Sequence, residues 1–187
     1  MVSSRIPSLT LSRPLSLVGF MGCGKSTVGR ALAQALNVPF VDLDDDIAQM
    51  AKAPIPQIFS TWGEVGFRDY EENALRLLPP KCVVATGGGA FAWPKTHNRL
   101  QEETTTVWLK VPPPVLWVRL AKERAHRPLL QSPTWQQDAE TLYAQRQPWY
   151  EKAHVTIQAD GDDVATVVQE ILTCPALSHN RNGKNPL

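Results

Sequence analysis

A glycine-rich segment near the N-terminus carries the clearest chemical signature. Residues 19–26 read Gly-Phe-Met-Gly-Cys-Gly-Lys-Ser, which matches the pattern G-x-x-x-x-G-K-[ST] of a phosphate-binding loop. In such a loop, backbone N–H groups and the N-terminus of the following helix face the phosphates of a nucleotide. Lys25 can reach the β- and γ-phosphates, and the Ser26 hydroxyl can ligate Mg²⁺. The alternative is an ordinary glycine-rich turn capped by Ser26.

Carboxylates cluster after the next apolar run, at Asp42 and at residues 44–46. One interpretation is helix capping, for which Asp45 and Asp46 are well placed, because carboxylates offset the unpaired N–H groups of a helix start. The carboxyl ends of strands, however, face the ligand crevice of an open α/β sheet. We therefore also consider Asp42 for metal binding and Asp44 for the acceptor hydroxyl of a phosphoryl transfer.

Three consecutive glycines, residues 87–89, follow directly after the apolar run at residues 82–86. Glycines at a strand end indicate a backbone that approaches another group closely, although a flexible turn gives the same pattern. In many phosphate-loop proteins an acidic residue of another strand helps to hold Mg²⁺. Because this strand ends in glycines, the metal-supporting role shifts most simply to Asp42.

Arg68, Arg127 and Arg146 are the cationic candidates outside the phosphate loop. Their planar guanidinium groups suit carboxylates and phosphates. Each also fits a surface cation whose stem covers apolar area. Arg127 lies in a polar, basic loop, residues 124–133, which could close over a nucleotide and exclude water.

The elements that position these residues follow from hydrophobic patterning. Strands are predicted at residues 15–19, 38–42, 82–86, 104–111 and 155–158, and helices at 26–36, from 47, at 64–78, 115–123, 134–150 and 164–172. Pro54 and Pro56 are expected to break the helix that starts at residue 47. Alternating strands and helices predict an α/β domain with a mainly parallel sheet.

Composition limits the remaining possibilities. The 187 residues are 43% hydrophobic and carry a net charge of +1, which fits one globular domain and disfavours a nucleic-acid-binding protein. The three cysteines form no C-x-x-C pair, which fits a reducing cytosol and no zinc site. No apolar run approaches the length of a membrane helix. We expect a short N-terminal arm at residues 1–13, one domain at 14–174 and a disordered tail at 175–187.

Six motifs follow one another along the chain. They are GFMGCGKSTVGR at residues 19–30, VDLDDDI at 41–47, GFRDYEE at 66–72, VVATGGGA at 83–90, RPLL at 127–130 and QRQPWY at 145–150. In this order they resemble the shikimate kinase family, and the resemblance implies a P-loop NTPase fold, with a five-stranded parallel sheet flanked by helices and a lid loop. It also implies MgATP-dependent phosphorylation of the 3-hydroxyl of shikimate, on the route to chorismate and aromatic amino acids.

The same resemblance implies roles for individual residues. The ATP phosphates would be bound by Gly22, Cys23, Gly24, Lys25, Ser26, Thr27 and the lid residue Arg127, while Ser26 and Asp42 would hold Mg²⁺. Shikimate would be bound by Asp44, Arg68, Gly88 and Arg146. Lys25, Asp44 and Arg127 would be the catalytic residues.

The sequence departs from the family pattern around the adenine. Leu120 stands where some members have a second lid arginine, and residues 159–163 lack the Arg or Asn-Pro often found there. We therefore expect altered adenine contacts but the same reaction. The expected partners are ATP and shikimate, without nucleic acid or membrane, for a cytoplasmic or plastid-stromal monomer. Two other readings stay open: a different small-molecule kinase, such as a gluconate kinase, and a catalytically silent homologue.

Overall fold

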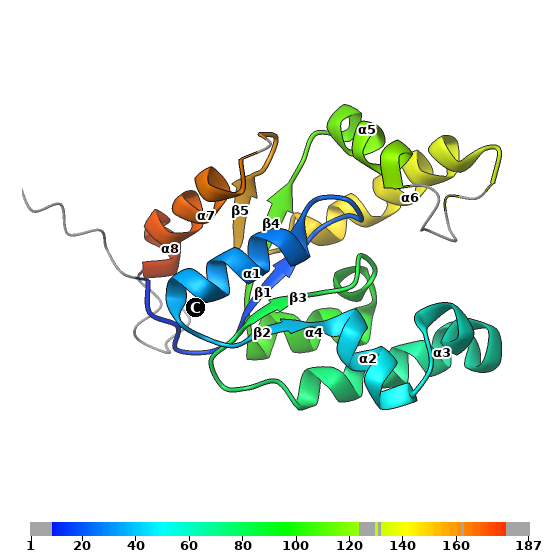
Figure 1. The fold of residues 1–187 in the computed structure, drawn as a ribbon, viewed down its shortest axis with the longest axis horizontal. Helices are drawn as coiled ribbons and strands as arrows, with labels where there is room; N and C mark the ends of the chain where they lie inside the picture. The colour runs from blue at the N-terminus through cyan, green and yellow to red at the C-terminus, as the bar shows by residue number, and fades with distance from the viewer. Residues whose placement is uncertain (1–8, 124–129, 131, 162, 179–187) are drawn as a thin grey trace, which may run out of the picture.

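The computed structural model describes residues 9–123, 130, 132–161 and 163–178. A parallel sheet runs through the middle of this part of the chain (Figure 1). Its strands are β1 (Leu15–Val18), β2 (Phe40–Asp42), β3 (Val83–Ala85), β4 (Thr105–Lys110) and β5 (Val155–Gln158), in the order β2-β3-β1-β4-β5. Every residue of β1 and β3 is buried, as expected for parallel strands covered on both faces. The predicted five-stranded parallel sheet is confirmed.

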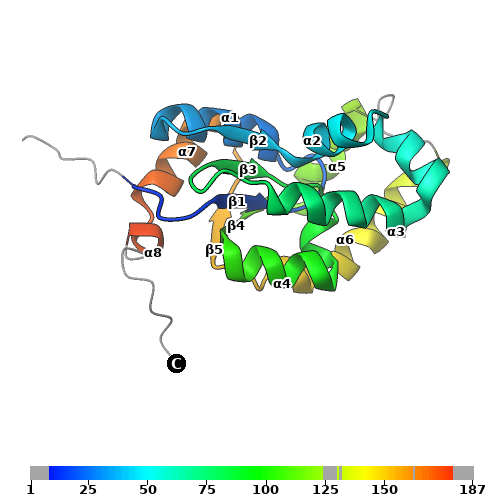
Figure 2. The ribbon, with the colours of Figure 1, turned by 90° about the horizontal axis from the view of Figure 1, so that it is seen from below.

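Helices cover both faces of the sheet. Figure 2 shows α1 (Lys25–Leu36) and α7 (Val164–Thr173) on one face, and α4 (Pro94–Glu103) with α6 (Trp135–Tyr150) on the other. The helices α2 (Leu43–Ala51), α3 (Ile55–Arg76) and α5 (Pro113–Glu123) extend beyond the carboxyl ends of the strands. The remaining elements are the 3₁₀ turn η1 (Ala90–Ala92) and α8 (Pro175–Ser178). The carboxyl edge of the sheet is therefore the place where loops and helices meet.

The helix expected to break at Pro54 and Pro56 does end before them, because α2 stops at Ala51, and the two prolines also start the next helix. Pro54 precedes the first residue of α3, and Pro56 lies in its first turn. A proline is tolerated there because the missing N–H group would have no acceptor within the helix. Helix α3 then runs to Arg76, interrupted only at Gly63, whose φ of 67° and ψ of −170° are not helical. The positive φ suits glycine and lets the chain change direction at this residue.

Helix α4 is absent from the sequence-based prediction. Among its ten residues only Thr96, His97 and Leu100 are buried, so hydrophobic patterning gives little signal. Its position is fixed by charge as well as by packing, because Glu72 of α3 pairs with both Lys95 and Arg99 of α4. The Thr96 hydroxyl also donates a hydrogen bond to the Ala90 carbonyl, which ties α4 to the turn η1.

Both ends of the domain extend further than predicted. Leu9 and Leu11, expected in a loose arm, are buried in the core, and Arg13 donates to the Thr105 hydroxyl at 3.0 Å. The prediction of disorder from residue 175 is wrong for residues 175–178, which form α8. Leu177 of α8 is only 5% exposed and belongs to the same hydrophobic cluster as Leu9 and Leu11. Apolar side chains at both ends thus extend the core.

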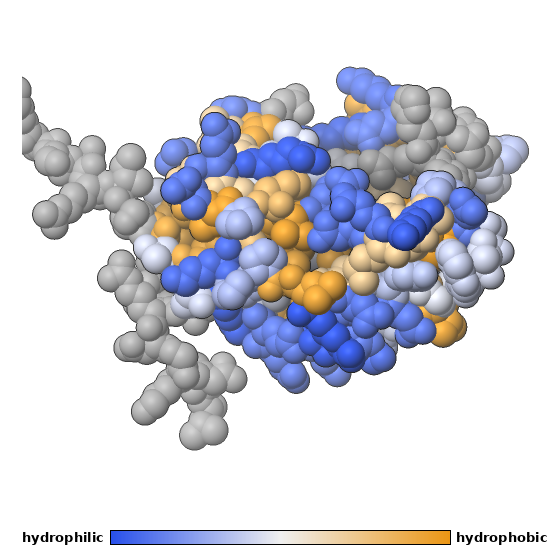
Figure 3. Space-filling model, turned by 60° about the horizontal axis from the view of Figure 1, so that its bottom comes forward, coloured by the Kyte–Doolittle hydropathy of each residue, from blue (hydrophilic) through white to orange (hydrophobic). Residues whose placement is uncertain are grey.

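The surface mixes apolar and charged side chains, as the face in Figure 3 shows. Phe59 and Trp62 of α3 are 40% and 45% exposed. Phe59 stacks on Phe67, and Trp62 meets Tyr70 edge to face, so each ring packs along its own helix. Within the described residues, no helix combines the length and the apolar character that crossing a membrane requires.

We expect Leu177→Ala to destabilise the protein although the residue lies in the predicted tail. Truncating a buried leucine costs about 2 kcal/mol or more, because the contacts of the lost methyl groups are not replaced. The melting temperature should fall by about 4–8 °C for a domain of this size. Ala176→Ser, at an exposed neighbouring position, is the control. Equal melting temperatures for the two variants would show that α8 does not contribute to the core.

Candidate active site

The phosphate-binding loop joins β1 to α1. Gly24 precedes α1 with a φ of 92°, a conformation that favours glycine and turns the chain into the helix. Lys25 extends along the loop, and its ammonium donates to the carbonyl oxygens of Gly19 and Phe20, both at 2.9 Å. The same ammonium lies 3.6 Å from the Cys23 sulfur. The lysine therefore holds the loop in a curved shape with its cation on the inner side.

Asp42 links the loop to the next helix. One carboxylate oxygen accepts a hydrogen bond from the Ser26 hydroxyl at 2.6 Å, and the other caps α2 by accepting from the Asp44 N–H group at 3.3 Å. The cap of α2 is therefore Asp42. Asp45 and Asp46, the capping candidates of the sequence analysis, lie in the first helical turn. There their negative charges suit the positive end of the helix.

The Ser26 hydroxyl and the Asp42 carboxylate form a pair of oxygen donors beside the phosphate loop. Mg²⁺ prefers oxygen ligands and retains several waters, so a site with few protein ligands fits this ion. Among the described residues no group of three or more His, Cys, Asp or Glu side chains could hold a metal by itself. A divalent cation at this pair would therefore complete its ligands with phosphate oxygens and water.

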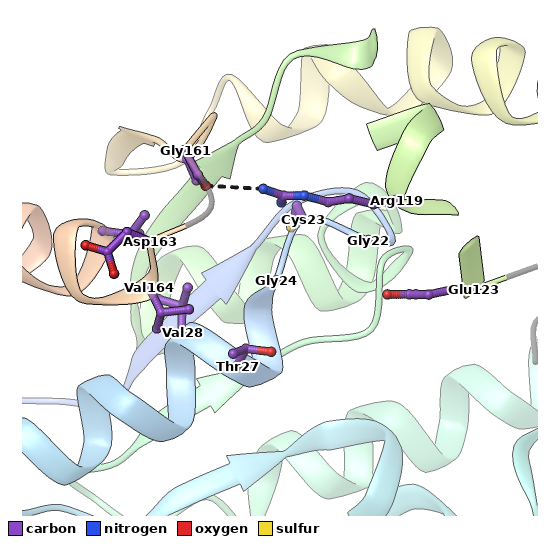
Figure 4. A pocket seen from close by; sticks show the side chains of 12 residues that line it. Gly22, Cys23, Gly24, Thr27, Val28, Arg119, Glu123, Gly161, Asp163 and Val164 are labelled. Atoms are coloured by element: carbon purple, nitrogen blue, oxygen red, sulfur yellow. Dashed lines mark hydrogen bonds between the residues drawn. The ribbon is translucent and has the colours of Figure 1, made fainter. Parts of the chain in front are cut away.

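A cavity of about 230 Å³ opens on the outer side of the phosphate loop (Figure 4). Its walls come from the loop, from α5 and from the segment between β5 and α7, and its lining residues are Gly22, Cys23, Gly24, Thr27, Val28, Arg119, Glu123, Ala159, Gly161, Asp163, Val164 and Val167. Arg119 donates to the Gly161 carbonyl at 3.2 Å across this space. The cavity lies where a nucleoside joined to phosphates in the loop would extend.

An arginine lines this cavity although Leu120 stands where some family members have one. Its side chain is fully buried, and a methyl group built on Gly22 would lie 2.9 Å from the Leu120 Cδ2 atom. Leu120 therefore packs beneath the phosphate loop, while Arg119, one residue earlier on α5, reaches the cavity wall. Asp163 caps α7 by accepting from the Ala165 N–H group and the Thr166 hydroxyl. The departure from the family pattern at residue 120 therefore leaves a guanidinium in the cavity wall, that of Arg119.

A cluster of charged side chains surrounds the glycine turn at residues 87–89. A methyl group built on Gly87 would lie 2.9 Å from an Asp44 carboxylate oxygen. One built on Gly89 would lie 2.8 Å from Arg68 Nη2 and 3.1 Å from Arg146 Nη2. Three charged side chains from three helices therefore meet at this turn.

Gly88 connects this cluster to the phosphate loop. A methyl group built on it would lie 3.4 Å from the backbone nitrogen of Met21 and 3.7 Å from Arg146 Nη1. The structure thus brings Asp44, Arg68, Gly88 and Arg146 to one place, beside the loop, although they are far apart in the sequence.

Arg68 is held on several sides. Its guanidinium donates to Glu71 at 2.7 Å and to Glu64 at 3.1 Å. It also lies over the rings of Phe67 and Trp93, at 5.4 Å and 5.2 Å from their centroids. These contacts fix a long side chain that would otherwise lose much conformational freedom on binding an anion. The arginine is therefore preorganised at the cluster.

Glu71 is a site residue that the sequence analysis did not single out. Its side chain is completely buried, and its Oε1 atom has no hydrogen-bond partner within the described residues. A methyl group on Gly87 would lie 3.5 Å from this oxygen, which therefore faces the cluster. Burial raises the pKa of Glu71, and the neighbouring Arg68 opposes that rise. The three-residue spacing from Arg68 on one helix was the available signal.

Arg127 lies outside the described residues, as does most of the segment 124–133 predicted as a lid. The structure gives no position for its guanidinium. Its assignment to the nucleotide phosphates therefore stays a prediction. The other predicted site residues fall into two neighbouring groups, one at the phosphate loop and one at the glycine turn.

Known proteins resemble this chain in sequence and fold. The model of the shikimate kinase family matches residues 21–175. A shikimate kinase of Rhodopseudomonas palustris is 42% identical over 170 residues, covering 90% of this chain and 82% of the relative. The structure of an Acinetobacter baumannii shikimate kinase in complex with shikimate superposes with a TM-score of 0.79 at 36% identity, covering 86% of this chain and 90% of that one.

A gluconokinase from Sinorhizobium meliloti resembles the chain less closely. Its TM-score is 0.59 at 20% identity, with 90% of this chain and 93% of that chain covered. At that level of identity the likeness shows a shared fold alone. The match to the family model and the relatives at about 40% identity show that the chain belongs to the shikimate kinase family.

Proposed function

We propose that the reaction takes place at the carboxyl edge of the sheet, where the phosphate loop presents MgATP to shikimate bound at the glycine turn. As a shikimate kinase, the protein uses ATP to phosphorylate shikimate. The products would be shikimate 3-phosphate and ADP. The observation that carries the proposal is the meeting of Asp44, Arg68 and Arg146 around residues 87–89, next to the loop.

The two arginines suit the carboxylate of shikimate. Both guanidinium groups lie close to Gly89, so one bound carboxylate can accept hydrogen bonds from both. Planar guanidinium groups offer parallel donors that match the geometry of a carboxylate, and such charge-assisted bonds are strong. Arg68 and Arg146 would therefore fix one end of the substrate ring.

Asp44 suits the other end of the substrate. Its carboxylate accepts hydrogen bonds only, so it can orient the 3-hydroxyl and receive its proton during transfer. The backbone N–H group of Gly88 would donate to another substrate hydroxyl. Gly88 also lies next to Met21 of the phosphate loop, so a hydroxyl held here is close to the bound phosphates. The Gly88 N–H group and the Asp44 carboxylate would therefore together orient the 3-hydroxyl, which is the nucleophile.

The phosphate loop supplies the other half of the reaction. Backbone N–H groups of residues 22–27 would surround the phosphates, and the Lys25 ammonium would offset charge that develops on the transferred group. Ser26 and Asp42 would hold Mg²⁺, which neutralises phosphate charge during transfer. Arg127 would add a further positive charge from the lid. Phosphoryl transfer depends mainly on such positioning and electrostatic stabilisation.

An ADP-release assay tests the proposed function directly. With MgATP we expect release that depends on shikimate and saturates with it. Release with gluconate, or with no acceptor, should stay at background. A folded protein that binds ADP but shows no shikimate-dependent release would support another acceptor or a silent homologue.

Asp44→Asn should lower kcat by about 10²–10⁴-fold, because the amide keeps the size of the side chain but cannot receive the proton. The KM values for shikimate and ATP should change much less. Asp45→Asn removes an exposed carboxylate of the same helical turn and is the matched control. Near-normal turnover of Asp44→Asn would remove Asp44 from the acceptor role.

Gly89→Ala should raise the KM for shikimate roughly tenfold or more, since the new methyl group displaces both guanidinium groups from the carboxylate. The fold should be retained, because the three nearest atoms are the ends of two arginine side chains and none belongs to the backbone. The KM for ATP serves as the internal control and should stay within about twofold. A shikimate KM equal to that of the wild type would contradict the proposed carboxylate site.

A further inference from the structure

We infer that Tyr150 is a positioning residue for shikimate: its hydroxyl fixes the peptide that follows Gly88 and joins it to Arg146. The inference rests on the substrate-binding roles proposed above for Gly88 and Arg146. It adds a residue that touches neither reacting group.

The carbonyl groups of the glycine turn have different partners. The Gly87 carbonyl accepts from the Ala90 N–H group, and the Gly89 carbonyl accepts from the Ala92 N–H group. The carbonyl between them, that of Gly88, accepts instead from the Tyr150 hydroxyl at 2.5 Å. One of three successive carbonyls is thus held by a side chain that lies 62 residues further along the chain.

This hydrogen bond restrains the backbone conformation of Gly88, the residue whose N–H group is proposed to bind substrate. Because peptide bonds are planar, the Gly87 carbonyl shares a plane with the Gly88 N–H group, and the Gly88 carbonyl shares one with the Gly89 N–H group. The bond to Ala90 fixes the first plane, and the bond to Tyr150 fixes the second. Together they set both backbone dihedral angles of Gly88. Glycine is the residue with the most backbone freedom, so this restraint matters more here than elsewhere.

The same hydroxyl faces the carboxylate-binding arginine. Arg146 and Tyr150 are four residues apart on α6, so their side chains leave the same face of the helix. Burial raises the pKa of Tyr150, while the nearby Arg146 guanidinium opposes that rise. The phenol therefore stays neutral and keeps the proton that it donates to Gly88. One oxygen atom thus couples the two groups that would bind opposite parts of shikimate.

The ring of Tyr150 has a separate, structural role. It is fully buried and stacks on Trp108 of β4, with the ring centroids 6.0 Å apart. Tyr150→Phe keeps this ring and removes only the hydroxyl, so packing and positioning can be tested separately. Tyr143, two helical turns earlier on α6, is also buried and packs edge to face on Phe20. Tyr143→Phe is therefore a matched control for the loss of a phenol oxygen from this helix.

The test compares the two variants with the wild type. For Tyr150→Phe we expect the KM for shikimate to rise about three- to tenfold, the effect of losing one net hydrogen bond. The KM for ATP should stay within about twofold. The dissociation constant for shikimate alone, measured calorimetrically, should rise by the same factor, while that for ADP stays constant. Tyr143→Phe should leave shikimate binding unchanged.

Other outcomes would overturn the inference. Unchanged shikimate binding in Tyr150→Phe would show that the hydroxyl does not position the turn. Equal weakening of shikimate and ADP, or equal effects of both variants, would indicate a purely structural role. A wild-type protein without shikimate-dependent ADP release would instead contradict the proposed function itself. The two failures are therefore distinguishable.

Discussion

The active site depends on a turn in which three consecutive residues have no side chain. The space that a Cβ atom would occupy on Gly87 is taken by the Asp44 carboxylate, and on Gly89 by two guanidinium groups. Gly88 leaves room for the phosphate loop on one side and for Arg146 on the other. Any side chain here would push apart the charged groups that are proposed to bind one small molecule. This sterically empty turn explains why β3 ends in glycines rather than in an acidic residue.

The charges gathered at the turn require compensation, because burying an ionised group is costly unless it is paired. Glu71 is completely buried, and only one of its oxygens pairs with Arg68. The second oxygen faces the turn without a partner among the described residues. A polyhydroxylated substrate brings donors to such a site, whereas an apolar one would leave it unsatisfied. Glu71 thus suits a hydroxyl-rich ligand and also holds Arg68, the arginine proposed to bind the carboxylate.

The sequence predicts best what is local. The phosphate loop is contiguous, and each strand is a short segment rich in apolar or β-branched residues, so both are recognised without tertiary information. Helix α4 is not predicted, because only three of its residues are buried. Helix α3 begins earlier than expected, because Pro54 and Pro56 occupy positions at which prolines start helices. Leu177 belongs to the same hydrophobic cluster as Leu9 and Leu11, from the other end of the chain, and no local pattern encodes that association.

The substrate half of the site differs in this respect from the nucleotide half. Arg68, Asp44, the glycine turn and Arg146 come from four separate elements, and only the family resemblance placed them together before the structure did. Even that resemblance gave no role to Glu71 or Tyr150. Their importance follows from burial and from single hydrogen-bond partners, such as the Gly88 carbonyl for Tyr150. Such pairings are properties of the folded chain, because residues 88 and 150 meet only when α6 packs at the turn.

The start of α2 joins the two halves of the reaction. Asp42 accepts from Ser26 of the phosphate loop with one oxygen and from the backbone of Asp44 with the other. The group proposed to support the metal and the group proposed to receive the hydroxyl proton therefore belong to one helix cap. The first turn of α2, which carries Asp44, is thereby tied to Ser26 of the phosphate loop through Asp42. The proposed phosphoryl donor and acceptor sites are thus connected by one short hydrogen-bonded motif.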